Sequence, residues 1–536
     1  MITRRKAVTA TALGVMGALV LTACSGGSSD GDGSDGSGNE AGLVTGGTFR
    51  HAVFPEVGSV IPMSANQPQE IQVITYSYES LIYTDETGEE TPWLAESWEV
   101  GDDGTSVTFE LRDDVTFQDG TPFDAEAAAA SINYHTDPDN VSVLSDVLPA
   151  GLQASGSGTT LEVTAEATDP FLATIIGDIW MVAPAGLEDP SSLEQASNGT
   201  GLYALTGVQA DRYVFETRDD YTWGPGGLTS DSEGIPDGLE VSVVTDASTR
   251  ANLLLSGELN AAAVEGPDQD RLDASGYEFA GTINPIGQML FNEREDRPTH
   301  DPLVREALIL GYGHDDVAEV VSGGRPVELT SWITDAPFTC FSEEPVWERP
   351  EADPERAAEL LDEAGWTAGA DGAREKDGEP LEINFIYDAA STSHASAAEL
   401  VAQDWEELGI TTNLIAMDGA AWSEYLYETF DYDTGWIQIG VGSPVTQNLF
   451  YGGASPEDGG LNFMGTDDPE YNELAAQATS ASDPDEACDY WKQAEKVVVE
   501  NFHTFLLTGT IRPTYMSKAT FEITDYVQPV TIRMTE

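Results

Sequence analysis

The sequence has few positive charges for its length. Its 536 residues include 22 Lys and Arg against 95 Asp and Glu, which gives a formal net charge of −73 at pH 7. Proteins that bind DNA or RNA need clustered cations, so we exclude nucleic acid as a partner. The acidity fits either a site for cations or a solvated surface suited to a salty environment. We favour the second, and expect such a surface to need salt to screen its self-repulsion.

The motifs of metal and nucleotide chemistry are also missing. The six histidines are dispersed, and the sequence has no H-E-x-x-H pattern and no G-K-[ST] phosphate loop. We therefore expect no metal, no cofactor and no catalytic residues, with a secreted hydrolase as the weaker alternative. His51 and His503 stay open as ligands of a metal chelate, although a lone histidine is more often structural.

A long uncharged run lies near the N-terminus. Residues 7–23 carry no charge, follow the cations at 4–6 and end in Leu-Thr-Ala before Cys24. This order predicts a secretory signal over residues 1–23. The last four letters resemble the bacterial lipobox, which implies cleavage before Cys24 and lipidation of its sulfur. A membrane-spanning helix is the alternative, but the run is at the bottom of the spanning range. The export route, general secretory or twin-arginine, stays open.

A stretch rich in Gly, Ser and Asp follows the signal. Its composition cannot bury enough apolar surface to offset the entropy of ordering it, so we predict a flexible tether over residues 24–45. The body would then lie on the extracellular face of the cell membrane, held through the lipid anchor.

Cysteine is scarce as well. Only Cys340 and Cys488 follow Cys24, and an even pair in an oxidising compartment suggests a disulfide. Two buried free thiols are the alternative, because the sequence does not show whether the two positions approach each other.

Strand and helix patterns alternate along most of the body. Residues 381–387 alternate like a half-buried strand, and the apolar stripe of 397–408 predicts a helix that Gly409 ends. Residues 410–415 give the next strand. A second such unit covers residues 240–264. This alternation predicts an α/β fold with helices on mainly parallel sheets.

The stretch from 93 to 175 has a different pattern. Short alternating strands and turns surround an alanine-rich helix that Asp124 caps. We interpret it as an α+β subdomain inserted in the first lobe.

Several motifs in this order resemble one known family. They are the W-L-A-E-S-W-E-V of 93–100, the G-T-G-L-Y of 199–203, and the F-N of 291–292 followed by D-P-L-V-R-E-A-L at 301–308. They are similar to motifs of the family 5 extracellular solute-binding proteins of ABC importers, whose members bind oligopeptides, dipeptides, nickel chelates and related solutes.

The resemblance implies a two-lobed fold of the periplasmic-binding-protein type (type II). It implies lobe 1 at 46–285 with an inserted subdomain at about 76–199, lobe 2 at 286–505, and a C-terminal return to lobe 1 at 506–536. The lobes would close as a hinge on a small solute. The implied partners are the solute and the transmembrane permease subunits of the importer, and we expect a monomer. A lipoprotein that feeds a signalling partner instead is the alternative.

The resemblance also implies positions for ligand contacts. In the second lobe, Trp436 matches a ligand-facing tryptophan, with core packing as the alternative, and Gln438 falls on the same predicted strand face. Ile439 replaces the acid with which peptide-binding members pair an ammonium group, and Asp433 or Glu79 could substitute for it.

The first lobe supplies the other candidates. Met63 and Asn66 lie in the loop of 55–66, where the family places ligand contacts. Tyr78 and Glu79 match a family segment near the cleft, although we favour helix packing, the alternative, for both.

Overall fold

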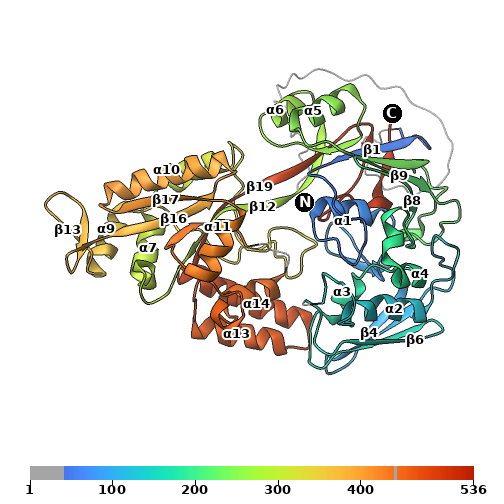
Figure 1. The fold of residues 1–536 in the computed structure, drawn as a ribbon, viewed down its shortest axis with the longest axis horizontal. Helices are drawn as coiled ribbons and strands as arrows, with labels where there is room; N and C mark the ends of the chain where they lie inside the picture. The colour runs from blue at the N-terminus through green and yellow to red at the C-terminus, as the bar shows by residue number, and fades with distance from the viewer. Residues whose placement is uncertain (1–41, 146, 440–442) are drawn as a thin grey trace, which may run out of the picture.

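The computed structural model describes residues 42–145, 147–439 and 443–536. A ten-stranded mixed sheet extends through the length of the molecule (Figure 1). Its strands, in spatial order, are β17 (Thr411–Met417), β16 (Glu382–Asp388), β18 (Thr434–Trp436), β12 (Glu278–Phe291), β19 (Thr504–Met516), β11 (Ala261–Ala263), β1 (Thr48–Val53), β10 (Gly238–Val243), β9 (Arg212–Thr217) and β8 (Tyr203–Gln209). We call the half around β1 lobe 1 and the half around β16 lobe 2.

A strand-helix-strand unit lies at the centre of lobe 1. Strand β1 pairs in parallel with both β10 and β11, and helix α5 (Ala247–Ser256) connects these two neighbours. Asp246 caps α5 by accepting a hydrogen bond from Thr249 N at 2.7 Å. Gly257 ends the helix with a φ of 75°, a left-handed conformation that glycine adopts without strain. The α/β unit predicted for 240–264 is confirmed.

A smaller α+β unit is inserted between α1 (Pro68–Thr75) and β8. Its antiparallel sheet has the order β4 (Ala95–Val100), β5 (Ser106–Leu111), β7 (Thr160–Thr164), β6 (Gln153–Ser157). Helix α2 (Ala125–Thr136) packs against it so closely that a Cβ on Gly156 would lie 1.9 Å from Ala125 O. Glycine is therefore required there. The unit also holds β2 (Ile82–Thr84), β3 (Glu90–Pro92), α3 (Leu172–Gly177) and α4 (Pro184–Glu188).

In lobe 2 the sheet separates two apolar cores. Successive side chains of a strand point to opposite faces. Met289 and Phe291 accordingly belong to one core and Leu290 to the other. The first core is covered by α7 (Pro302–Leu310), α8 (His314–Val321), α9 (Pro354–Glu363) and α10 (Thr392–Glu407). The second is covered by α11 (Gly419–Glu424), α12 (Pro444–Tyr451), α13 (Pro469–Ser480) and α14 (Pro484–Glu500).

Two long strands cross between the lobes. The antiparallel pair of β12 and β19 extends from Glu278 opposite Met516 to Leu290 opposite Thr504. One end of β19 pairs with β11 of lobe 1, and the other end of β12 pairs with β18 of lobe 2. The two strands are therefore the covalent connection between the lobes (Figure 1).

The remaining elements are short. They are α6 (Asp268–Ala274), β13 (Thr367–Ala368), β14 (Arg374–Lys376), β15 (Glu379–Pro380), β20 (Ala519–Thr520) and β21 (Arg533–Met534). The two ends of the described body meet, because Leu43 forms a β-bridge with Thr535 and Val44 N donates to Met534 O at 2.9 Å. Ordered pairing thus begins two residues before the predicted end of the tether. Across the described ranges, no helix has the length and apolarity needed to cross a membrane.

Candidate functional site

A cleft of about 720 Å³ lies between the two lobes. Lobe 1 contributes residues of α1, the inserted unit and the C-terminal segment 524–529, and lobe 2 contributes residues 336–341 and the start of α14. This volume is within the range of about 300–1,000 Å³ that is typical of small-molecule sites.

The lobes touch at the borders of this cleft. A Cβ on Gly88 of lobe 1 would lie 3.5 Å from Pro337 Cα, and one on Gly104 would lie 3.5 Å from Ser482 Cβ. Phe171 of the inserted unit packs in the second core of lobe 2. The structure therefore shows the lobes in contact around the cleft.

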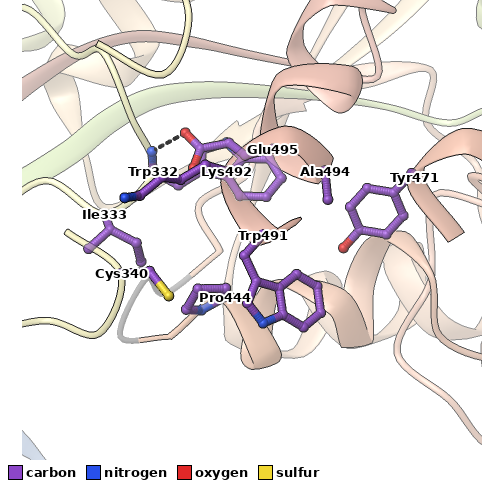
Figure 2. A pocket seen from close by; sticks show the side chains of 9 residues that line it. All are labelled: Trp332, Ile333, Cys340, Pro444, Tyr471, Trp491, Lys492, Ala494 and Glu495. Carbon is purple, nitrogen blue, oxygen red and sulfur yellow. Dashed lines mark hydrogen bonds between the residues drawn. The ribbon is translucent and has the colours of Figure 1, made fainter. Parts of the chain in front are cut away.

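Beside the start of α14, the wall from lobe 2 consists of a segment without helix or strand. We call residues 331–347 the strap. Glu495 of α14 anchors its base by accepting a hydrogen bond from Trp332 N at 2.6 Å (Figure 2). It also accepts from Trp347 Nε1 at 2.6 Å and from Ser331 Oγ at 3.2 Å. Burial raises the pKa of Glu495 to about 7, against the lowering effect of these hydrogen bonds.

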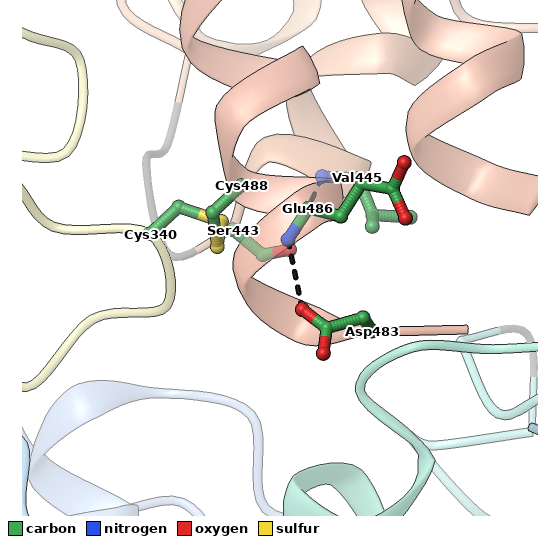
Figure 3. Close-up of a disulfide and its surroundings, with 6 residues drawn as sticks. All are labelled: Cys340, Ser443, Val445, Asp483, Glu486 and Cys488. Atoms are coloured by element: carbon green, nitrogen blue, oxygen red, sulfur yellow. Dashed lines mark hydrogen bonds between the residues drawn. A yellow bond between two sulfur atoms is a disulfide. The ribbon is translucent and has the colours of Figure 1, made fainter. Parts of the chain in front are cut away.

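A disulfide holds the middle of the strap. Cys340 is bonded to Cys488 near the start of α14 (Figure 3), and both cysteines line the cleft. Asp483 caps this end of α14 by accepting from Glu486 N at 3.0 Å. Cys488 and Glu495 are two helical turns apart, so one face of α14 fixes the strap at two points.

The strap is also bonded to the crossing strands. Thr334 Oγ1 donates to Ile283 O at 3.0 Å, and Ile283 N donates to Asp335 Oδ2 at 2.6 Å. Gln438 Nε2 donates to Pro285 O at 2.6 Å in the same stretch of β12. A change in the angle between the lobes would therefore move the cleft wall directly.

Carboxylates outnumber cations in the cleft. Glu90, Asp178, Asp485 and Asp525 line it together with Lys492. Desolvation by the surrounding protein, reinforced by the charge of Glu90, raises the pKa of Asp178 to about 7, although the residue is in part accessible to solvent. Burial also raises the pKa of Asp525 above its usual value.

Of the six residues predicted to contact ligand, Tyr78 lines the cleft. It is buried, and its hydroxyl accepts a hydrogen bond from Asn198 N at 3.1 Å. Gln438 lies at the crossing strands, as described above. Strand β18 ends at Trp436, so the predicted alternation does not extend to Gln438 and the two do not share a strand face.

The other four, like Gln438, lie outside the cleft lining. Trp436 is buried in the first core of lobe 2 against Phe385, with ring centroids 5.1 Å apart. Met63 is 1% exposed, within the apolar core beneath Tyr78. Asn66 is exposed and accepts from Gln67 Nε2.

Glu79 points into lobe 1. It is 3% exposed and accepts hydrogen bonds from Tyr221 OH at 2.7 Å, Thr200 Oγ1 at 2.8 Å and Trp223 Nε1 at 3.1 Å. Burial raises the pKa of Glu79 to about 7, against the lowering effect of these bonds and of Arg218. Its partners make it an internal anchor of lobe 1.

The two histidines considered as metal ligands lie in separate places. His51 contacts Tyr76 OH through Nδ1 at 2.7 Å in lobe 1. His503 of lobe 2 is bonded to Glu293 at 2.7 Å and Asp468 at 3.2 Å. Within the described residues, no group of three or more His, Cys, Asp or Glu side chains has an arrangement that could hold a metal ion.

The sequence did not reveal the strap as a cleft wall. Phe338 and Phe341 line the cleft from it, as Tyr526 does from the C-terminal segment. These stretches have no periodic pattern, and the paired cysteines were the one sequence signal that pointed to the region.

Comparisons with known proteins agree on one family. The model of the bacterial extracellular solute-binding proteins, family 5 Middle, matches residues 89–460. The chain is 28% identical to the nickel-binding periplasmic protein of Escherichia coli over 363 residues, 65% of this chain and 67% of that protein. It is 26% identical to a dipeptide-binding protein of Pseudomonas aeruginosa over 524 residues, 86% of this chain and 90% of that one.

Solved structures show the same fold. NikA from Brucella suis, in complex with Fe(III)-EDTA, matches with a TM-score of 0.74 at 23% identity, over 91% of this chain and 100% of that one. The oligopeptide-binding protein AppA from Bacillus subtilis, in complex with a nonapeptide, matches with a TM-score of 0.68 at 17% identity, over 92% and 100%. The predicted two-lobed α/β fold is confirmed.

Proposed function

Because the chain belongs to the bacterial extracellular solute-binding proteins of family 5, we propose that it is the substrate-binding component of an ABC importer. It captures a small solute between its lobes and delivers it to the permease without changing it chemically. The observation that carries this proposal is the cleft of about 720 Å³, which has one wall in each lobe. The paired strands β12 and β19 connect the lobes, and a connection of this kind can bend as a hinge.

The experiment is to identify the solute. The protein is purified from its native culture without refolding, and mass spectrometry identifies what is released on denaturation. Calorimetry then measures affinity, and small-angle scattering measures whether the radius of gyration falls on binding. We expect one bound solute per chain and uptake that is lost when the gene is deleted. Uptake that is unchanged by deletion would refute the importer role and favour a sensor.

The relatives suggest candidate solutes, which are dipeptides and nickel. We propose that the contacts come from the cleft residues Tyr78, Asp178 and Phe338 and from Tyr526. We also propose the lobe boundaries implied by the sequence, at 285/286 and 505/506. The crossing strand β12 supports the first boundary at Pro285, whose partner on β19 is Gly509. A single chain supplies both walls of the cleft, which supports a monomer.

The membrane anchor is a further part of the proposal. The signal peptide, Cys24 and most of the tether lie outside the described residues, so it rests on the sequence alone. We propose that the chain is exported and that a lipid on Cys24 holds it at the outer face of the membrane. A Cys24→Ala variant should appear in the soluble fraction of cells, and one that stays with the membrane after a carbonate wash would contradict the anchor.

A further inference from the structure

Among the described residues, four half-buried aromatic side chains in the cleft have no aromatic partner. They are Trp180, Phe338, Phe341 and Tyr526. All four line this cleft, and none of them makes a ring-ring contact with another residue in the described part of the chain. They come from both walls, since Phe338 and Phe341 are on the strap and the other two are in lobe 1. Elsewhere in the cleft, Tyr83 and Trp93 already pack edge to face, with centroids 5.5 Å apart.

The lining is enriched in rings and not in charges. Eight of its 30 residues are aromatic, about three times the 9% found over the whole chain. Five of the 30 are charged, slightly below the 22% of the chain. The acidity of the cleft is therefore the acidity of the whole protein, whereas the aromatic content is particular to the cleft.

Partly exposed rings in a cleft favour the binding of a ligand that has a flat apolar surface. Covering them removes apolar area from water, and a ring on the ligand gains a further edge-to-face or offset-stacked contact with each ring it meets. Apolar surface gathered in a concave site is characteristic of a binding function.

Charge restricts the occupant further. Four carboxylates and one lysine line the cleft, so a solute with net negative charge would meet repulsion inside walls that exclude much of the water. A positively charged group would meet carboxylates and ring faces, both of which attract it.

We propose that this cleft selects solutes that carry at least one aromatic ring and no net negative charge. The inference rests on the proposed function and narrows its ligand class. It assigns Phe338 and Tyr526 as rings that contact the ligand from opposite walls.

Three dipeptide probes separate the ring from the charge. Tryptophyl-tryptophan amide is cationic and aromatic, leucyl-leucine amide is cationic and aliphatic, and N-acetyl-tryptophyl-tryptophan is anionic and aromatic. Calorimetry with the full-length protein, at a physiological ionic strength of about 0.15 M where the charges of the cleft are not fully screened, measures the three affinities. We expect the aromatic amide to bind about tenfold more tightly than either of the others.

Variants then test the assigned rings. Phe338→Leu and Tyr526→Leu keep apolar bulk but remove the ring, and each should weaken the aromatic amide about two- to tenfold. Trp366→Leu is the matched control, because Trp366 is a half-buried ring of lobe 2 that is not part of the cleft lining. Thermal unfolding confirms that each variant is folded at the temperature of measurement.

Two results overturn the inference. These are equal affinity for the two amides, or no binding of any of the three probes. A co-purified solute that lacks an aromatic ring would also overturn it while leaving the solute-binding role intact. Absence of any bound solute, with uptake unchanged by gene deletion, would refute the role itself.

Discussion

The buried carboxyl group of Glu79 should make the stability of this protein fall as the pH rises. Its pKa in the folded state is about 7, against an ordinary value of 4.5. A raised pKa means that the folded state disfavours the ionised form. Between pH 4.5 and pH 7 the folded protein therefore holds a proton that the unfolded chain has released, and the free energy of unfolding falls as the pH rises through this window.

The magnitude follows from the difference between the two pKa values. Each pKa unit corresponds to about 1.4 kcal/mol, so ionising Glu79 costs about 3 kcal/mol in full. Between pH 5 and pH 8 the contribution is about 2.5 kcal/mol, because a fraction of the unfolded chain is already ionised at pH 5.

Glu79→Gln isolates this contribution. The glutamine is neutral at both pH values, and its carbonyl can accept the bonds from Thr200 and Trp223. Its amide can donate to the Tyr221 hydroxyl, which is able to accept. We expect the free energy of unfolding of the variant to fall by about 2.5 kcal/mol less than that of the wild type between pH 5 and pH 8.

Urea unfolding followed by circular dichroism measures this difference at the two pH values. Other buried acids affect both proteins equally and cancel. Glu99→Gln, which changes an exposed carboxylate of the inserted unit, is the control and should keep the wild-type pH dependence. An equal fall in the Glu79→Gln variant and the wild type would refute the assignment of a raised pKa to Glu79.

Three further predictions concern the disulfide, the lobe contact and salt. Replacing Cys340 and Cys488 by serine should lower the free energy of unfolding by up to about 5 kcal/mol, because the bond joins positions 148 residues apart; an unchanged urea midpoint would contradict this. Arg325→Gln removes an ion pair between lobe 2 and Asp270 and Asp273 of α6. Arg325 is 32% exposed, so the loss should be below about 1 kcal/mol and should disappear in 1 M salt. A loss that persists there would exclude the ion pair as its origin. The melting temperature of the wild type should rise between 10 mM and 1 M salt, since salt screens the repulsion among its carboxylates; a constant value would argue against that repulsion.

The sequence predicted the parts of the fold that repeat local patterns. Asp246 begins α5 by capping its N-terminus, and Gly257 ends it with a left-handed φ. Both effects depend on the type of a single residue, so they can be predicted from the sequence. The strand-helix-strand units followed because alternation and helical stripes depend on neighbours along the chain. The family motifs then supplied the two-lobed arrangement, which local patterns alone do not specify.

The site was harder to predict because its walls come from distant, irregular segments. Trp436 is on a strand buried on both faces, and alternation does not show which of two cores receives its ring. Glu79 is acidic and adjacent to the cleft residue Tyr78, but the three donors that bind it lie more than 120 residues away. Phe338 is a cleft residue because the strap lies across from lobe 1, and this placement follows from the tertiary structure and not from a local pattern.

The strand order has a consequence for how the chain is made. Strand β1 emerges early during synthesis, but its neighbour β11 has the last long strand, β19, on its other side. Apolar residues from 519 to 532 also fill the core of lobe 1. Lobe 1 therefore cannot complete its core until almost the entire chain has been synthesised, whereas most of lobe 2 is one continuous stretch. Late pairing of such distant segments slows folding and leaves the edge of β11 open in the meantime. This delay would benefit a chain that must stay unfolded while it is exported through a channel in the membrane.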